Sequence, residues 1–119
     1  MAKKLDRGDE SWRRKSIIEA SRSANSDALP QLLARLDQET HANRRHIILA
    51  LGNIGGDRAE EKLLELLEAE TGLALGDVVR ALGRMKSRRA VAKLKELADH
   101  PEEWVRQHVT FALRNIRGM

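Results

Sequence analysis

Apolar residues recur along this chain at the spacing of an amphipathic helix, and the whole pattern then returns at a nearly constant step. In one copy the apolar stripe consists of Val78, Ala81, Leu82 and Met85. These positions follow the i, i+3, i+4, i+7 order that places side chains on one face of an α-helix. The same step leads from Ala50 to Ala81 and from Ala81 to Ala112, and a step shorter by one position leads from Ala20 to Ala50. The sequence therefore predicts four similar helices, which we call the A helices.

Two further columns of apolar residues support this alignment. The first holds Ile17, Ile47, Val78 and Val109, and the second holds Ala24, Ile54, Met85 and Ile116. In this alignment Arg22 and Arg114 replace the glycine that the middle copies have at Gly52 and Gly83. We interpret the two glycines as positions where helices approach closely.

A second helical series is predicted between the A helices. Its columns repeat at the step that separates Ala50 from Ala81, and they consist of Ala28, Ala59 and Ala90, and of Leu32, Leu63 and Leu94. Each repeat is therefore expected to be an antiparallel helix pair, and we call its second members the B helices. Four A helices and three B helices predict a half-built last repeat. We interpret its helix, which carries Trp104 and Phe111, as a cap; docking on another chain is the alternative.

The residues between the helices agree with this reading. Gly55 follows an A helix where a left-handed C-terminal cap is expected, and Asn25 holds the matching place in the first copy. Ser26 and Asp57 are predicted to cap the B helices that follow. Pro30 is placed in the first turn of its helix, where a missing N–H is tolerated.

Two segments resemble a known repeat. Residues 50–59, Ala-Leu-Gly-Asn-Ile-Gly-Gly-Asp-Arg-Ala, are similar to the HEAT-like repeat of phycobilisome lyases, and residues 99–106 resemble its inter-repeat turn. The resemblance covers about residues 9–118. It implies an all-α, right-handed α-solenoid of about three and a half helical hairpins, about seven helices, whose B helices line a concave side where partners often bind. We expect residues 9–119 to form one domain and residues 1–8 to be a mobile basic tail.

Composition limits the classes of protein to which the chain can belong. Leu, Ala, Arg, Glu and Lys dominate the 119 residues and cysteine is absent, which favours helices and argues against disulfides and thiolate chemistry. We find no apolar run long enough for a membrane span and no secretory signal, and we expect a cytoplasmic protein. The 22 basic residues outnumber the 18 acidic ones only slightly, so the net charge alone identifies no partner.

Two surfaces are candidate binding sites. The first, the B-helix ladder, consists of exposed polar positions on successive B helices: Gln31, Lys62, Glu65, Lys93 and Glu96. The second, the basic edge, consists of cations at the turns from A to B helices: Arg58, Arg84, Lys86, Arg88 and Arg89. A solenoid places equivalent turns along one edge, and the turns from B to A helices carry acidic residues instead. For the ladder, the simpler interpretation is a solvated helix face with weak ion pairs.

Candidate catalytic and metal-binding residues are few. His46, Asp77 and His108 share one column, which we expect to lie outward on the surface. Neighbouring helix axes are about 8–10 Å apart, too far for these side chains to share one ion at about 2 Å. The sequence has no Gly-rich phosphate loop and no G-x-S-x-G motif. We therefore predict no enzymatic activity, no cofactor and no metal site.

Other prominent side chains have structural interpretations. Trp12 and Trp104 are expected to be buried against adjacent loops. Arg14, Arg44 and Arg106 share a column and are expected to form ion pairs with acidic residues of the preceding turns.

The sequence thus predicts a protein-binding scaffold or adaptor, monomeric unless the terminal half repeat forms a dimer. Binding of nucleic acid by the basic edge is the alternative function. The absence of tyrosine and the glutamates among the B-helix lysines argue against it. A lyase-type or chromophore-handling role, suggested only by the resemblance, is a third and minor alternative.

Overall fold

The computed structural model describes residues 9–117 and contains the seven predicted helices, so the predicted tail, residues 1–8, lies outside the described residues. The A helices are α1 (Glu10–Arg22), α3 (His41–Ile54), α5 (Gly72–Arg84) and α7 (Glu103–Arg117). The B helices are α2 (Leu29–Arg35), α4 (Asp57–Ala69) and α6 (Val91–Glu96). Short 3-10 turns are η1 (Ser26–Ala28), η2 (Arg88–Ala90) and η3 (Leu97–Asp99).

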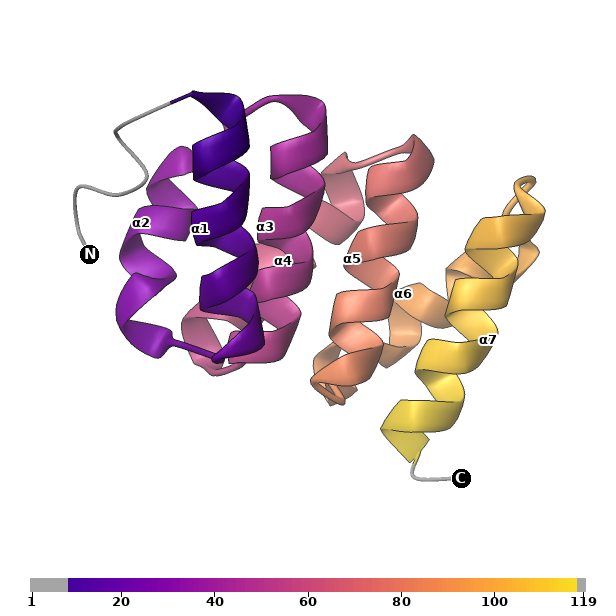
Figure 1. Cartoon of the computed structure of the whole chain (residues 1–119). Helices are drawn as coiled ribbons and strands as arrows, with labels where there is room; N and C mark the ends of the chain where they lie inside the picture. The colour runs from indigo at the N-terminus through magenta and orange to yellow at the C-terminus, as the bar shows by residue number, and fades with distance from the viewer. Residues whose placement is uncertain (1–8, 118–119) are drawn as a thin grey trace.

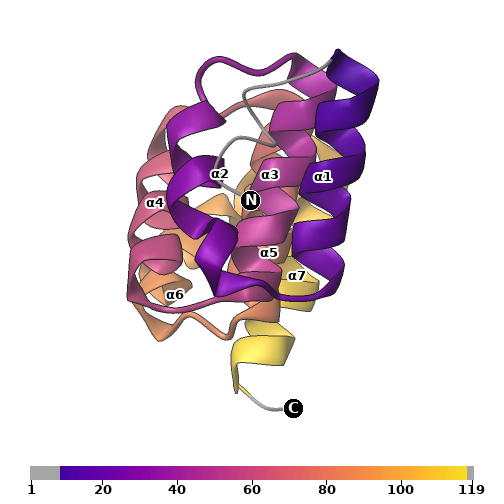
Figure 2. The ribbon, with the colours of Figure 1, turned by 60° about the vertical axis from the view of Figure 1, so that its left-hand side comes forward.

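The helices form two layers that stack along one direction. Figure 1 shows α1, α3, α5 and α7 side by side in one layer, and Figure 2 shows α2, α4 and α6 as a second layer beside it. The molecule is elongated, with extents of 41 × 25 × 19 Å. This arrangement confirms the all-α solenoid of about three and a half hairpins. Within residues 9–117, no helix has both the length and the apolar character needed to cross a membrane.

The core is the seam between the two layers. The A helices contribute Ile47, Val78 and Val109, and the B helices contribute Leu32, Leu63 and Leu94. All six side chains are at most 1% exposed. Burying one such aliphatic side chain contributes about 1.5–3 kcal/mol, so this seam stabilises each hairpin and joins it to the next.

Small residues bring the A helices into direct contact. A Cβ atom added at Gly52 would lie 2.7 Å from the Cβ of Ala81, and one added at Gly83 would lie 2.7 Å from the Cβ of Ala112. Real Cβ atoms do not approach so closely. The two glycines are therefore sites of close helix packing, as the sequence predicted.

The shorter step predicted between the first two copies is wrong. The N-caps of α1 and α3, Asp9 and Thr40, are separated by the same step as Ala50 and Ala81. The left-handed residues after the first three A helices, Ala24, Gly55 and Lys86, have φ of 49°, 73° and 57° and recur at that step as well. In this register Ser21, not Arg22, corresponds to Gly52.

The error arose because α1 has a neighbouring A helix on one side only. At positions 16 and 19 it carries Ser16 and Glu19, where α3 has the fully buried Ile47 and Ala50. The apolar pattern is therefore incomplete in the first copy. Matching alanine to alanine shifted its alignment by one residue.

The turns between A and B helices differ from the prediction by one residue in the same way. Asn25 is extended, and its side chain accepts a hydrogen bond from the N–H of Asp27, so it does not hold the left-handed place. Ser26 and Asp57 are first helical residues, and the preceding residues, Asn25 and Gly56, are the N-caps. The left-handed Gly55 and the position of Pro30 at the start of α2 are confirmed.

The outer face of α7 is polar where the other A helices are apolar or small. Thr110 corresponds to the fully buried Ile48 and Val79, and Arg114 corresponds to Gly52 and Gly83. Thr110 is exposed and Arg114 is also exposed. This substitution pattern favours the interpretation of α7 as a cap, because a further helix packed in the same manner would bury polar groups.

Gly83→Ala tests the close contact between α5 and α7. In an exposed helix this change is stabilising by about 1 kcal/mol. Here overpacking costs typically about 1–3 kcal/mol, so we expect urea denaturation to show a free energy of unfolding lower by about 1 kcal/mol. The matched control is Arg114→Ala, at the equivalent position of α7, which should change stability by less than about 0.5 kcal/mol. A gain in stability for Gly83→Ala would show that the two helices are not in contact there.

Candidate functional sites

In the B-helix ladder Glu65 and Glu96 are exposed and Lys62 and Lys93 are half-buried, and these charges are paired with one another. Lys62 lies 3.5 Å from Glu65 on α4, and Lys93 lies 3.5 Å from Glu96 on α6. Lys93 also reaches across to Glu68 at 3.2 Å, and this hydrogen bond raises its pKa. Such exposed pairs contribute little to stability. They leave the ladder with little unbalanced charge.

Gln31 of α2, the remaining member of the ladder, is half-buried. The resemblance implied that the B helices line a concave side. Two hollows of the described residues lie on the A helices instead of on that side. The small residues in the A-helix seams draw that layer together, and the B helices contact one another less. The concave B-helix side therefore stays a prediction.

The residues of the basic edge gather at one end of the stack. Figure 1 shows the turns from α1 to α2, α3 to α4 and α5 to α6 at the same end. Arg58, Lys86 and Arg88 are exposed, and none forms an ion pair with a described residue. Arg84 donates a hydrogen bond to the side-chain oxygen of Asn53 at 2.6 Å. These cations are thus free of carboxylate partners within residues 9–117.

Arg89 differs from the rest of the basic edge. Its guanidinium lies 3.0 Å from a carboxylate oxygen of Glu61 and 3.7 Å from one of Glu60. Ser87, fully buried at the same turn, donates a hydrogen bond to Glu60 at 2.6 Å. Arg89 therefore ties the turn to α4 rather than presenting a free charge.

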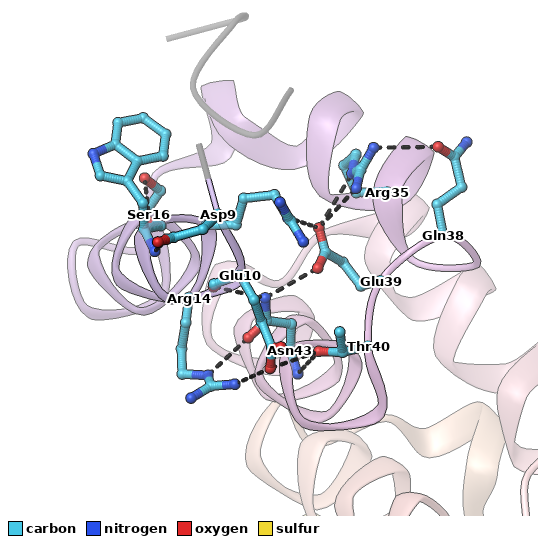
Figure 3. A network of polar contacts seen from close by, with 11 residues as sticks. Asp9, Glu10, Arg14, Ser16, Arg35, Gln38, Glu39, Thr40 and Asn43 are labelled. Atoms are coloured by element: carbon cyan, nitrogen blue, oxygen red, sulfur yellow. Dashed lines mark hydrogen bonds and ion pairs between the residues drawn. The ribbon is translucent and has the colours of Figure 1, made fainter. Parts of the chain in front are cut away.

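At the opposite end of the stack, the carboxylate of Glu39 is buried and is bound by two arginines and one amide. Its side chain is fully buried and accepts hydrogen bonds from Arg13 at 2.9 Å, from Arg35 at 3.1 and 3.2 Å, and from Asn43 at 3.0 Å. Burial alone would raise the pKa of Glu39, but the hydrogen bonds from Asn43, Arg35 and Arg13 together hold it below its ordinary value. Figure 3 shows Glu39 between α2 and α3, with Arg35 and Asn43 directed at it.

Asn43 extends this network to α1. Its side chain is fully buried, accepts a hydrogen bond from Arg14 at 2.8 Å and donates to the carbonyl oxygen of Glu10 at 3.1 Å. Thr40 donates to the Glu10 carboxylate and caps α3 through the Asn43 N–H, as Figure 3 shows. The network joins the first three helices, so these residues have a structural role that the sequence did not reveal. The spacing of Glu39 and Asn43, one helical turn apart, was the one available signal.

The ion pair of Arg13 with Glu39 recurs in the next repeat. Arg44 binds both carboxylate oxygens of Glu70, and the hydrogen bond to Glu70 raises the pKa of Arg44. The two pairs have the same separation along the chain, and in the third repeat the equivalent residues are apolar, Leu75 and Pro101. The cationic column is therefore Arg13, Arg44 and Arg106, and the predicted inclusion of Arg14 was another effect of the shifted register.

The predicted ion pairs of this column hold only in part. Arg44 pairs with Glu70 in the turn that leads to α5, not with the preceding turn. Arg14 pairs with Glu10 in its own helix. Arg106 donates instead to the carbonyl oxygen of His100 at 2.6 Å.

We had predicted that the column of His46, Asp77 and His108 lies on the surface, and this prediction is only partly correct. Asp77 is only 5% exposed and accepts a hydrogen bond from Arg45 at 2.6 Å. Both histidines are half-buried, and burial lowers their pKa. The neighbouring Arg14 and Arg45 lower the pKa of His46 further, while Asp77 acts in the opposite direction. The described residues contain no group of three potential metal ligands close enough to hold an ion.

The two tryptophans have different environments. Trp104 is half-buried and packs over Gly76, with its ring edge-on to His108 at a centroid distance of 6.4 Å. Trp12 is 39% exposed, so the prediction of its burial is wrong. It lies on the side of α1 that has no neighbouring A helix.

A third candidate surface was not foreseen from the sequence. We call it the A-face groove: a hollow of about 210 Å³ that crosses α1, α3 and α5. Ile18 and Leu49 line it with aliphatic atoms, and Arg22, Arg80 and Arg84 line it with cations. The sequence alone could show that each of these residues lies outside the core columns. It could not show that they line one hollow, because that depends on the register of the A helices in the structure.

Comparisons with known proteins identify the repeat in both halves of the chain. A family model described as HEAT repeats matches residues 1–75. A second model, described as the PBS lyase HEAT-like repeat, matches residues 74–100. Neither the curated proteins nor the solved structures gave a significant match.

Glu39→Gln tests the buried network. The change removes the negative charge that Arg13 and Arg35 share, and breaking a buried ion pair in this way costs about 3 kcal/mol. We expect a loss of that size in the free energy of unfolding measured with urea. Glu65→Gln is the matched control, because its side chain is 65% exposed, and it should change stability by less than about 0.5 kcal/mol. Equal effects of the two substitutions would contradict a structural role for Glu39.

The two half-buried histidines predict a dependence of stability on pH. Because their pKa is lower in the folded protein than the ordinary 6.5, the unfolded chain binds protons first as the pH falls. Stability should therefore be full above pH 6.5 and decline as the pH falls from there toward the lowered pKa values. Thermal unfolding between about pH 7.5 and pH 5 would measure this. The double variant His46→Gln/His108→Gln should flatten the decline, and an unchanged slope would contradict the assignment.

Proposed function

Because the chain belongs to the family of HEAT repeats, we propose that it is a non-enzymatic scaffold or adaptor that binds another protein. HEAT repeats commonly mediate protein interactions. A stack of rigid hairpins presents its exposed side chains in fixed rows, which suits recognition of a partner. Function nevertheless resides in particular surfaces rather than in the fold, so the candidate surfaces have to be compared.

The free cations of the basic edge are the observation that supports this proposal best. Arg58, Lys86 and Arg88 come from turns of two successive repeats, are exposed, and have no carboxylate partner among the described residues. Cations held on one edge attract a negatively charged surface and accelerate its encounter. The partner that this edge favours is an acidic protein surface.

The B-helix ladder is the weaker candidate. Lys62 and Lys93 are already paired with neighbouring glutamates, so a partner would have to replace existing ion pairs. We include the ladder as a flanking contact of the same partner rather than as the main site.

The proposal includes no catalytic residue and no cofactor. Partial burial in the A-helix layer accounts for the perturbed histidines without a chemical role. A cytoplasmic location, which the cysteine-free sequence favours, and a monomeric state, which the polar outer face of α7 favours, belong to the same proposal.

Affinity capture with charge-altered variants tests the basic edge. The variant combines Arg58→Glu and Arg88→Glu with Lys86→Asn, because asparagine tolerates the left-handed backbone of Lys86. From nuclease-treated lysate of the source organism at about 0.1 M salt, we expect the wild type to retain one or more acidic proteins, and the variant to retain at least about tenfold less. The captured proteins are identified by mass spectrometry and their affinities are then measured with purified components.

The matched control replaces Lys62, Glu65, Lys93 and Glu96 by alanine and should retain the same proteins within about twofold. Equal recovery with the edge variant would reject the basic edge. Tighter binding of purified duplex or single-stranded DNA or RNA than of any captured protein would replace the proposal by the nucleic-acid alternative.

A further inference from the structure

Two stripes of side chains cross the outer surface of the A helices. Successive members of a stripe are as far apart along the chain as Ala50 and Ala81, which is one repeat. Each A helix therefore contributes one residue to each stripe. The first stripe is Ile18, Leu49, Arg80 and Phe111, and the second is Arg22, Asn53, Arg84 and Asn115. Figure 1 shows the layer of four helices that carries both stripes. The A-face groove lies where the stripes cross α1, α3 and α5.

The groove continues along α1. A second hollow of about 670 Å³ shares Ile18 and Arg22 with the groove and extends past Lys15 and Glu19. The two hollows together form an open depression on the A-helix side.

The charges of this depression are strongly unbalanced. Lys15, Arg22 and Arg80 form no ion pair with a described residue, and Arg84 binds only the neutral amide of Asn53. Glu19 is the single carboxylate that lines either hollow. A ligand for this surface must therefore carry negative charge.

The floor of the groove is aliphatic. Ile18 and Leu49 are half-buried, occupy equivalent positions on α1 and α3, and both line the hollow. A ligand that covered them would gain from removing apolar surface from water. Phosphates and sugars do not gain in this way, and His46 is the one aromatic ring among the residues that line either hollow, with no Phe, Tyr or Trp for base stacking. The combination favours a protein segment with carboxylates and apolar side chains over a nucleic acid.

We propose that the A-face groove binds an acidic amphipathic segment of a partner protein. Its apolar side chains pack on Ile18 and Leu49, and its carboxylates face Arg22 and Arg80. With helix axes about 9 Å apart, the path across α1, α3 and α5 is about 20 Å long, which corresponds to about 13 residues of helix. The proposal rests on the function as a protein-binding scaffold, and the groove shares only Arg84 with the basic edge.

Selection from a phage-displayed library of random peptides, each long enough to cross the groove as a helix, tests the groove without knowledge of the partner. We expect the peptides retained by the intact protein to be enriched in Asp and Glu together with Leu, Ile or Phe. Methyl NMR of the protein with one selected peptide should shift the Ile18 and Leu49 signals. Retention of basic peptides, retention of none, or shifts confined to other methyl groups would overturn the proposal.

Two matched charge reversals then locate the site. Arg22→Glu/Arg80→Glu should weaken binding of the selected peptide at least about tenfold in fluorescence anisotropy, because ligand carboxylates meet like charge there. Arg58→Glu/Arg88→Glu makes the same change in net charge at the basic edge and should alter the affinity less than about twofold. Circular dichroism verifies that both variants are folded. Equal losses would show an effect of net charge alone and would overturn the groove.

The experiment separates failure of the groove from failure of the proposed function. If the native partner is lost only with the basic-edge variant and no peptide reaches the groove, the scaffold function stands and the groove proposal is wrong. If selected peptides bind the groove but no cellular protein depends on the basic edge, the assignment of that edge is wrong. Shifts of Ile18 and Leu49 on addition of a short DNA duplex, with no retained peptides, would assign the groove to nucleic acid instead.

Discussion

Direct contact between successive A helices is the constraint on which the rest of the structure depends. It requires a small residue on each helix that faces a following A helix, and Gly52 against Ala81 and Gly83 against Ala112 satisfy this requirement in the second and third seams. Because side chains longer than a methyl group cannot enter these seams, the helices have one separation and one register. That register places Arg84 beside Asn53, and it joins the outward-facing side chains of α1, α3 and α5 in one groove.

The first seam is held together differently. At its small-residue position it has Ser21, which accepts a hydrogen bond from Asn53, instead of a glycine. The buried network of Glu39 and Asn43 ties α1 and α2 to α3 through charged and amide partners. A buried carboxylate is destabilising unless it is fully paired, and no side-chain nitrogen or oxygen that is buried among the described residues lacks a partner. Polar contacts thus reinforce the packing of α1 against α3 at the N-terminal end.

The regular part of this structure could be predicted from the sequence, and the exceptions have physical causes. The two middle repeats have neighbours on both sides, so most of their buried columns are apolar or small, and the helix pairs and glycine seams followed directly; Asn43, Asp77 and Ser87 are the buried polar exceptions among the described residues. The first repeat has one neighbour among the described helices, and its half-buried Ser16 and exposed Glu19 shifted the alignment by one residue. Asp77 was assigned to the surface because a charged residue normally lies there, and the burial of Glu39 was not foreseen for the same reason. Their burial depends on Arg13 and Arg45, which belong to other helices and meet them only after folding.

The placement of charge at the A-to-B turns argues for a function beyond folding. The N-terminus of a helix carries partial positive charge and favours anions, by about 0.3–1 kcal/mol for each group. Arg58 lies in the first turn of α4, and Arg88 lies in the 3-10 turn that leads into α6. Neither is compensated by an ion pair with a described residue. Arg89, beside Arg88, shows that the same turn can satisfy a cation with Glu60 and Glu61. Cations kept against the helix dipole and without an ion pair among the described residues agree with the acidic partner that we propose for the basic edge.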